Sequence, residues 1–227
     1  MNWSARRINL LADKLSARKY LEIGVEKGET FTDIRITERT AVDPAFAFDT
    51  TALANANTHF HQKPSDQFFA EISGNSLFDL IFIDGLHQFE QVVRDFSNAI
   101  IHSHSGSVIV LDDTKPIDIF SANPNRDDAI RFRRRTGVED AAWHGDVYKI
   151  VFYLHDFWPA LSYRTIVGSG NPQTFVWRSS NFTRKPRFNS LESISRLTYY
   201  ELMDNIDLLR ECDEGAAIAE ISAALLR

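Results

Sequence analysis

The sequence predicts an α/β fold, with an open and mostly parallel sheet that carries helices on both faces. Residues 78–84 and 107–112 are almost unbroken apolar runs, which are typical of strands covered on both faces. Between them, residues 89–100 place apolar side chains at the spacing of one helical face. A strand, a helix and a strand joined by short links form a parallel βαβ unit, whose crossover is right-handed in nearly all proteins.

The residues before this unit are expected to supply the other parallel strands. Residues 4–17 have apolar side chains at helical spacing, and Ser4 is the expected N-cap of that helix. Short apolar runs bounded by glycine or polar residues predict the strands that follow. In chain order, we expect a strand at 19–24, a helix beginning near Gly28, strands at 40–43 and 58–62, and a helix at 65–72 capped by Ser65.

A different pattern begins after Asp113. A turn rich in glycine, asparagine and proline separates two short apolar runs, at 163–167 and 174–178, and this predicts a hairpin. Further helices are expected at 125–136, at 146–157 and in the tail from 191 to 226. No linker or repeat separates the tail. We therefore expect a sheet domain over 1–187 and a helical extension of the same domain over 188–227.

The composition excludes several classes of protein. The chain has 227 residues and a formal net charge of −6, so it lacks the basic footprint of a nucleic-acid binder. Cys212 is the only cysteine, which excludes a disulfide framework and a thiolate zinc site. No apolar run approaches the roughly 18 residues of a membrane span, and the N-terminus lacks a secretion signal. We expect a cytoplasmic protein without a nucleic-acid partner.

Acidic residues follow the ends of four predicted strands. In an open α/β sheet, ligands bind outside the carboxyl ends of the strands, near the point where the strand order reverses. Side chains at these ends are therefore the first candidates for a functional site. They are Glu22 and Gly24 after the first strand, Asp43 after the second, Asp84 to His87 after the fourth, and Asp112 and Asp113 after the fifth.

The loop from Glu22 to Gly28 does not match the dinucleotide fingerprint, which needs glycines in the pattern G-x-G-x-x-G. Gly24 and Gly28 are four residues apart, and Glu26 between them would repel a diphosphate. A cationic or zwitterionic cofactor would meet no such repulsion. Asp43, 19 residues after Gly24, is suitably placed to accept hydrogen bonds from a ribose diol.

Together these motifs resemble the class I S-adenosylmethionine-dependent methyltransferases. The resemblance rests on Glu22-x-Gly24-x-x-x-Gly28, on Asp43 and on the run 78–87, which ends in Asp84-Gly-x-His87. With Val110-Leu-Asp-Asp113, it is most similar to the macrocin O-methyltransferase group among the divalent-metal-dependent O-methyltransferases. It covers residues 18–115. The family implies a Rossmann-like sheet whose last strand is antiparallel, which suits the predicted hairpin.

The resemblance implies roles for particular residues. The methionine end of the cofactor would lie against Glu22, Gly24, Glu26, Gly28 and Thr30, and Asp43 would hold the ribose. Glu26 replaces the middle glycine of the usual loop, where its side chain could crowd the methionine portion or bind its ammonium group. Mg²⁺ would bind Asp84, Asp112 and Asp113, and the catalytic residues would be His87 and Asp84.

Physical chemistry agrees with this implied metal site. Neighbouring parallel strands lie about 4.8 Å apart, so carboxylates at two adjacent strand ends can share one ion. Mg²⁺ binds one or two carboxylates and keeps several waters, which leaves positions for a substrate. Such an ion would lower the pKa of a substrate hydroxyl and aim its oxygen at the sulfonium methyl. His87 is the best candidate for the general base because imidazole titrates nearest neutral pH.

The predicted function is methyl transfer from S-adenosylmethionine to a hydroxyl of a sugar or small hydroxylated acceptor, assisted by a divalent metal. The C-terminal helices would pack across a homodimer or close over the acceptor. One alternative is a metal-independent methyltransferase acting on another acceptor. A second is a non-catalytic assembly partner that has lost cofactor binding through Glu26. A nicotinamide oxidoreductase is disfavoured by the missing glycine.

Several of the candidate residues and other polar motifs also have simple structural interpretations. Asp112 and Asp113 could cap a loop, and His87 could cap a helix. His59 and His61 would face one side of a strand, where we expect a surface or sheet-face role. We interpret the arginines at 131–135 as a solvated helix end, with Asp127 beside Arg131. For Trp143 we favour packing in the core, and for Asp146 a helix cap.

Overall fold

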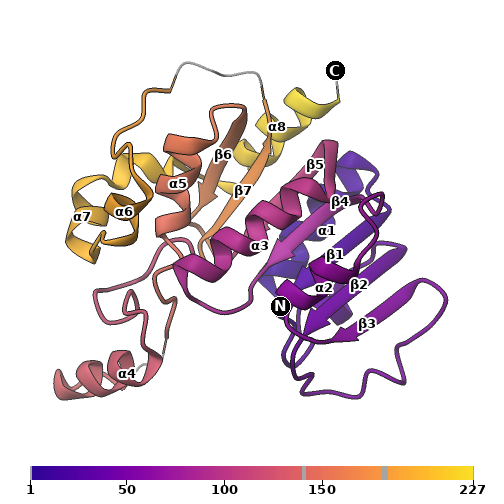
Figure 1. The fold of residues 1–227 in the computed structure, drawn as a ribbon, viewed down its shortest axis with the longest axis horizontal. Coiled ribbons are helices and arrows are strands. Elements are labelled where there is room, and N and C mark those ends of the chain that lie inside the picture. The colour runs from indigo at the N-terminus through magenta and orange to yellow at the C-terminus, as the bar shows by residue number, and fades with distance from the viewer. Residues whose placement is uncertain (1, 140–141, 180–183, 227) are drawn as a thin grey trace.

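The protein is described here from a computed structural model that covers residues 2–139, 142–179 and 184–226. Its centre is an eight-stranded sheet in the order β3-β2-β1-β4-β5-β7-β6-β8 (Figure 1). The strands are β1 (Lys19–Ile23), β2 (Glu38–Asp43), β3 (Thr58–Gln62), β4 (Phe78–Ile83), β5 (Ser103–Leu111), β6 (Leu161–Ile166), β7 (Gln173–Arg178) and β8 (Glu211–Cys212).

The pairing of the strands confirms the predicted fold class. Strands β1 to β5 are parallel to one another, whereas β7 is antiparallel to both β5 and β6. The order reverses between β1 and β4, which places the ends of these two strands beside each other. This reversal is where an open α/β sheet binds its ligands.

Helices cover both faces of the sheet, as the apolar runs predict. In β4, Ile81 and Ile83 pack on one face and Leu80 and Phe82 on the other, and all four are buried. The first face is covered mainly by α3 and α5 with the helices near the C-terminus, and the second by α1 and α8. The helices are α1 (Trp3–Leu15), η1 (Phe31–Asp33), α2 (Ser65–Glu71), α3 (Phe89–Ile101), α4 (Arg126–Arg135), α5 (Lys149–Phe157), α6 (Leu191–Ser195), α7 (Tyr199–Asp204), η2 (Ile206–Leu209) and α8 (Glu214–Leu225).

The helix expected near Gly28 is wrong. The segment between β1 and β2 contains only the 3₁₀ turn η1. Gly24, Glu26 and Gly28 all have positive φ, so the first part of the connection is an irregular loop. The rest of the segment packs Phe31 and Ile34, both buried, against the sheet. A short connection thus covers the part of the sheet where a helix was expected.

Two predicted N-caps are also wrong, because tertiary contacts use those hydroxyls. Asn2 caps α1 by accepting a hydrogen bond from the backbone of Ala5, whereas the Ser4 hydroxyl accepts one from Gln173 of β7. Helix α2 begins at Ser65 without a side-chain cap, and the Ser65 hydroxyl accepts a hydrogen bond from Gln91 of α3. Sequence spacing predicted the helices but not these partners.

Helix α4 projects away from the sheet at the end of a long connection (Figure 1). Arg131 pairs with Asp128, at 2.5 Å, rather than with the expected Asp127. Arg133 departs from the predicted solvated helix end, because it is 1% exposed and its guanidinium lies 2.6 Å from Asp118. This ion pair, with its arginine buried, anchors α4 to the preceding segment.

The tail joins the sheet rather than lying apart from it. Strand β8, which was not predicted, pairs with β6 in parallel through Thr165 and Glu211. Leu202 and Leu209 of the tail are fully buried in the core beneath α5, and α8 packs against α1. Within the described residues, no helix is long and apolar enough to cross a membrane.

Candidate active site

A cavity of about 1110 Å³ lies at the carboxyl ends of β1, β2, β4 and β5. This edge of the sheet is where the strand-end argument placed the functional site. All but one of the predicted site residues line the cavity; the exception, Gly28, lies in the same loop. The predicted residues in the lining are Glu22, Gly24, Glu26, Thr30, Asp43, Asp84, His87, Asp112 and Asp113.

Gly24 is required by close contact between the ends of β1 and β4. Its φ is +83°, and a Cβ atom there would lie 2.0 Å from the carbonyl oxygen of Asp84. Its N–H donates to the carbonyl of Val42 at 2.9 Å, which ties the loop to β2 as well. Only glycine combines this backbone conformation with this approach.

Glu26 occupies a left-handed backbone position, with φ of +44°, where the family loop carries a glycine. Its N–H donates to Asp43 and its carbonyl accepts from Ala47, so the backbone is held on both sides. The side chain is exposed and forms part of the cavity wall. A glutamate can therefore stand in this position at the modest cost of a left-handed conformation.

Asp43 organises the glycine loop. Its carboxylate accepts backbone hydrogen bonds from Val25 at 2.8 Å, Glu26 at 2.9 Å and Ala45 at 2.7 Å. The side chain is 8% exposed, and one oxygen accepts two of these bonds. The predicted contact with a ribose diol therefore has to use the acceptor capacity that remains on Oδ1.

Glu22 lies beneath the loop and is 1% exposed. The Tyr20 hydroxyl donates to its Oε2 at 2.5 Å. Burial raises the pKa of the Glu22 carboxyl well above its ordinary value, and the charges of Asp84 and Asp43 act in the same direction. The environment thus favours the neutral form of Glu22, which can donate a hydrogen bond.

Asp84, His87 and Asp113 form a compact group in which one donor atom from each lies within 4.8 Å of the others. His87 Nδ1 lies 2.9 Å from Asp113 Oδ2, and His87 Nε2 lies 3.6 Å from Asp84 Oδ1. No other group of three such ligands occurs in the part of the chain that the structure describes. Carboxylates and an imidazole at this spacing could hold a divalent cation.

Asp112 differs from the other two acids of the predicted metal set. It lies in the cavity wall but outside the compact group, and it is 5% exposed. Its Oδ1 accepts the backbone N–H of Asp113 at 2.9 Å. Asp113, with φ of +58°, turns its carboxylate toward His87. Adjacent positions in the sequence therefore have different surroundings.

Opposing charges shift the pKa values in this group. Burial raises the pKa of Asp84 to about 6, and the charge of Asp113 adds to the rise. Burial alone would lower the pKa of His87, but hydrogen bonds to Asp113 and Asp84 outweigh it and raise that pKa to about 10. The imidazole is therefore protonated at neutral pH and supplies the positive charge between the two carboxylates. It can accept a proton only when another cation neutralises them.

Trp143 and Asn171 complete the site, and sequence reasoning assigned neither to it. Trp143, expected in the core, is half-buried and its ring stacks on His87 at 4.8 Å between centroids. Asn171, in the turn between β6 and β7, donates to Asp113 Oδ1 at 3.2 Å. The only signal for Trp143 was its place beyond the fifth strand, a region that often faces the acceptor in methyltransferases.

Asp146 caps a helix, but not the helix that was expected. Its Oδ1 accepts the N–H of Phe89, the first residue of α3, at 2.8 Å. Its Oδ2 pairs with Lys149 at the start of α5, also at 2.8 Å. The carboxylate thus joins the beginnings of two helices beside the cavity, a contact that spacing along the chain cannot reveal.

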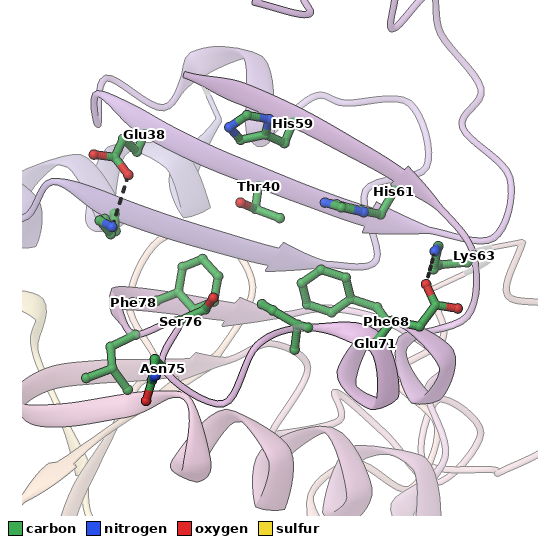
Figure 2. Close-up of a pocket in the computed structure, with 13 residues that line it drawn as sticks. Glu38, Thr40, His59, His61, Lys63, Phe68, Glu71, Asn75, Ser76 and Phe78 are labelled. Atoms are coloured by element: carbon green, nitrogen blue, oxygen red, sulfur yellow. Dashed lines mark hydrogen bonds and ion pairs between the residues drawn. The ribbon is translucent and has the colours of Figure 1, made fainter. Parts of the chain in front are cut away.

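A second cavity, of about 520 Å³, lies between α2 and the strands β1, β2 and β3 (Figure 2). His59 and His61 line it from the same face of β3, and the His61 ring packs on Phe68 at 5.0 Å. No third ligand joins them among the described residues. This arrangement confirms the predicted sheet-face role of the two histidines.

The central residues match a known family. Residues 21–114 fit the family model described as a methyltransferase domain, and this range includes the glycine loop and the compact acidic group. This match identifies a methyltransferase domain and supports a class I S-adenosylmethionine-dependent methyltransferase. The resemblance noted from the sequence is therefore confirmed at the level of this class, and the enzyme class with it.

Solved structures share the fold of this methyltransferase. An O-methyltransferase from Bacillus cereus in complex with SAH is 18% identical, with a TM-score of 0.56, over 78% of this chain and 82% of that chain. The O-methyltransferase TomG from Streptomyces achromogenes, in complex with SAM, is 15% identical, with a TM-score of 0.53, over 77% and 79% of the two chains. No curated protein matches this methyltransferase in sequence.

Proposed function

We propose that this methyltransferase transfers a methyl group from S-adenosylmethionine to a hydroxyl oxygen of a small acceptor such as a sugar, with assistance from a divalent cation. The observation that supports this most is the Asp84–His87–Asp113 group beside the glycine loop. A cofactor in the loop would bring its methyl group to the edge of the sheet where this group lies. Structural neighbours named as O-methyltransferases add support for oxygen as the acceptor atom.

The cavity suits the proposed cofactor. Its volume and its position at the reversal of strand order are typical of small-molecule sites in α/β proteins. The acids of the loop offer acceptors rather than a phosphate cradle, which suits a cofactor with an ammonium and a sulfonium group. We assign the methionine end to the loop from Glu22 to Thr30, with the exposed carboxylate of Glu26 facing the ammonium, and the ribose to Asp43.

The donor set suits Mg²⁺, which prefers oxygen ligands and keeps several waters. Asp84 and Asp113 would hold the ion, and Asp112 would support Asp113 through its backbone hydrogen bond. Bound there, the cation would supply Lewis-acid polarisation of the acceptor hydroxyl. Asn171, which donates to Asp113, would keep that carboxylate in place.

In the transfer step, the acceptor oxygen forms a bond to the methyl carbon as the bond from that carbon to sulfur breaks. The electron pair of the broken bond returns to sulfur, and the hydroxyl proton is released. His87 is placed to receive this proton in its neutral form, and the stacked Trp143 ring holds the imidazole in orientation. Asp84 orients the His87 ring, since its Oδ1 lies 3.6 Å from His87 Nε2.

Calorimetric titration with S-adenosylhomocysteine, with and without Mg²⁺, tests this proposal. We expect micromolar binding of the cofactor product and an additional heat on addition of Mg²⁺. Asp113→Asn should abolish the response to Mg²⁺ and leave cofactor affinity nearly unchanged, because asparagine tolerates the left-handed backbone of this position. Asp66→Asn, an exposed carboxylate of the same cavity, is the matched control and should retain both responses.

Each result has a distinct meaning. Cofactor binding without any effect of Mg²⁺ would contradict the metal-assisted mechanism and favour a metal-independent methyltransferase. A Mg²⁺ response that survives in Asp113→Asn would place the cation elsewhere. Folded protein that binds no S-adenosylhomocysteine at high concentration would contradict the cofactor assignment itself.

We also infer that residues 188–227 are a helical extension of the domain formed by 1–187. The pairing of β8 with β6 and the burial of Leu202 and Leu209 support this organisation. A homodimer stays a prediction. Its support is the exposure of large apolar side chains on α6 and α7, namely Leu191, Tyr200 and Met203.

A further inference from the structure

The two ends of the large cavity differ in charge. Its acidic lining residues lie at the ends of the parallel strands, in the loops that follow them and on the helices α2 and α3. Beyond Asp113, the connection that leads to α5 contributes only uncharged side chains, a histidine and one arginine to the described lining. These residues are Ile117, Arg126, Ala142, Trp143 and His144.

The geometry of α4 directs Arg126 toward the cavity. Arg126 and Arg133 are seven residues apart, which places them on the same face of the helix. Arg133 is buried, pairs with Asp118 and donates to the carbonyl of Ala142 at 2.6 Å. This face is therefore turned toward the body of the protein, and Arg126 at the first helical position lines the cavity. Arg134, in contrast, is exposed and does not line it.

Arg126 has no hydrogen-bond or ion-pair partner within the described ranges, and its side chain is exposed at the cavity rim. Nearby, Arg131 pairs with Asp128 and Lys149 with Asp146. Lys27, the other basic residue of the described lining, lies in the glycine loop where the cofactor is assigned. A guanidinium presents its donors as a planar fork that fits the two oxygens of a carboxylate or phosphate. An accessible and unpaired arginine at this rim can therefore bind an anionic group.

Trp143 links the Arg126 end of the cavity to the proposed catalytic group. Its ring stacks on His87 with an angle of 9° between the planes, and its Nε1 donates to the carbonyl of Asn123 at 2.6 Å. Asn123 lies three residues before Arg126, at the start of α4. An acceptor that lies along the Trp143 side of the cavity would thus reach from the Asp84–His87–Asp113 group to Arg126.

We propose that the acceptor is an anion, and that Arg126 binds its carboxylate or phosphate while its hydroxyl lies at the Asp84–His87–Asp113 group. This inference rests on the proposed function, because it names the substrate class of the same cavity. Arg126 is then a specificity-determining residue. It would favour anionic acceptors over neutral ones of the same shape without contributing to cofactor binding.

The test compares neutral and anionic diols in two pairs, catechol with 3,4-dihydroxybenzoate and ribose with ribose 5-phosphate. Each is titrated calorimetrically into the full-length protein saturated with S-adenosylhomocysteine and Mg²⁺. We expect the anionic member of at least one pair to bind about tenfold more tightly, the effect of one charge-assisted contact. Arg126→Gln should remove this preference. The matched control Arg134→Gln, on another face of α4, should retain it.

The two pairs separate an aromatic carboxylate from a sugar phosphate as the source of the anion. Equal affinities within both pairs, binding of none of the four compounds, or a preference that survives in Arg126→Gln would each overturn the inference. Binding of S-adenosylhomocysteine is measured first on the same samples. Loss of that binding would count against the proposed function, whereas its presence confines a negative result to the acceptor class.

Discussion

The cavity is built in two different ways at its two sides. At the strand ends, backbone atoms form the wall: Gly24 lies against the carbonyl of Asp84, and Asp43 accepts three backbone hydrogen bonds. The opposite side belongs to the segment between β5 and α5, where single side-chain contacts hold the chain. Arg133 pairs with Asp118, and Trp143 donates to the carbonyl of Asn123.

This difference suggests that the strand ends serve cofactor binding and methyl transfer, whereas the opposite side selects the acceptor. The strand ends are fixed by the register of a buried parallel sheet, so a change there disturbs the sheet as well as the site. In the connection on the opposite side, Ala122, Val147 and Tyr148 join the core, whereas Arg126 and Trp143, which line the cavity, do not. Such loop positions outside the core vary without loss of the fold. Substitutions in the loop backbone at the strand ends should therefore reduce both stability and cofactor binding strongly. Substitutions on the other side should have smaller effects on stability and act mainly on acceptor binding.

The largest effect is expected for Gly24→Ala. The new Cβ would lie 2.0 Å from the carbonyl oxygen of Asp84, and alanine disfavours a φ of +83°. We expect a loss of at least about 4 kcal/mol in the free energy of unfolding, measured in urea, together with loss of S-adenosylhomocysteine binding. Gly74→Ala is the matched control, since nothing lies within 4 Å of its Cβ position. Equal stability of the two variants would contradict the close contact between β1 and β4.

A smaller effect is expected at Asp95, a 1% exposed residue of α3 beside the strand ends. Burial raises its pKa to about 6, while hydrogen bonds from Ser65 and Gln91 act in the opposite direction. The folded state therefore favours the protonated carboxyl. This stabilisation is fully present below the ordinary pKa of about 3.9 and is lost as the pH rises through about 6.

Asp95→Asn should consequently stabilise the protein by up to about 3 kcal/mol above pH 7 and leave its stability nearly unchanged at pH 4. Urea unfolding at a series of pH values measures this dependence. Asp127→Asn, in which the replaced carboxylate is exposed on α4, is the control and should leave the pH dependence of the wild type in place. A wild-type stability that does not fall between pH 4 and 6, together with no gain in Asp95→Asn, would refute a buried carboxyl of raised pKa.

The smallest effect on stability is expected for Trp143→Ala on the opposite side. Loss of the stack on His87 and of the hydrogen bond to Asn123 should cost about 1–2 kcal/mol. Affinity for S-adenosylhomocysteine should stay within about twofold of the wild type, because Trp143 contacts the acceptor side. Calorimetry and urea unfolding measure the two quantities. A large loss of cofactor affinity would show that the two sides of the cavity are not independent.

The predictable part of the fold is the part with strong local patterns. The apolar runs at 78–84 and 107–112 predicted β4 and β5, and the helical spacing between them predicted α3. Strand β8 was missed because two residues carry no recognisable period, and they pair with β6 only after the tail has folded onto the sheet. The prediction of a helix near Gly28 was wrong because the loop has positive φ values, which are incompatible with a right-handed helix.

The candidate site divides in the same way. Its acids were found because the carboxyl ends of parallel strands share one edge, so Asp43, Asp84 and Asp113 had to lie near one another. Trp143 and Asn171 were not assigned to it, since they reach the cavity from a long connection and from a hairpin turn. No periodicity predicts where such segments return to the sheet.

The sequence by itself therefore determined the parallel sheet, its helical cover and the edge at which the acids gather. The apolar runs and the alternation of strand and helix are local features of the sequence, and they are sufficient for these conclusions. Only the tertiary structure decided that His87 rather than Asp112 joins Asp84 and Asp113, and that Arg126 lines the cavity. These outcomes depend on backbone turns and on contacts between residues far apart in the chain, which are settled only when the segments pack together.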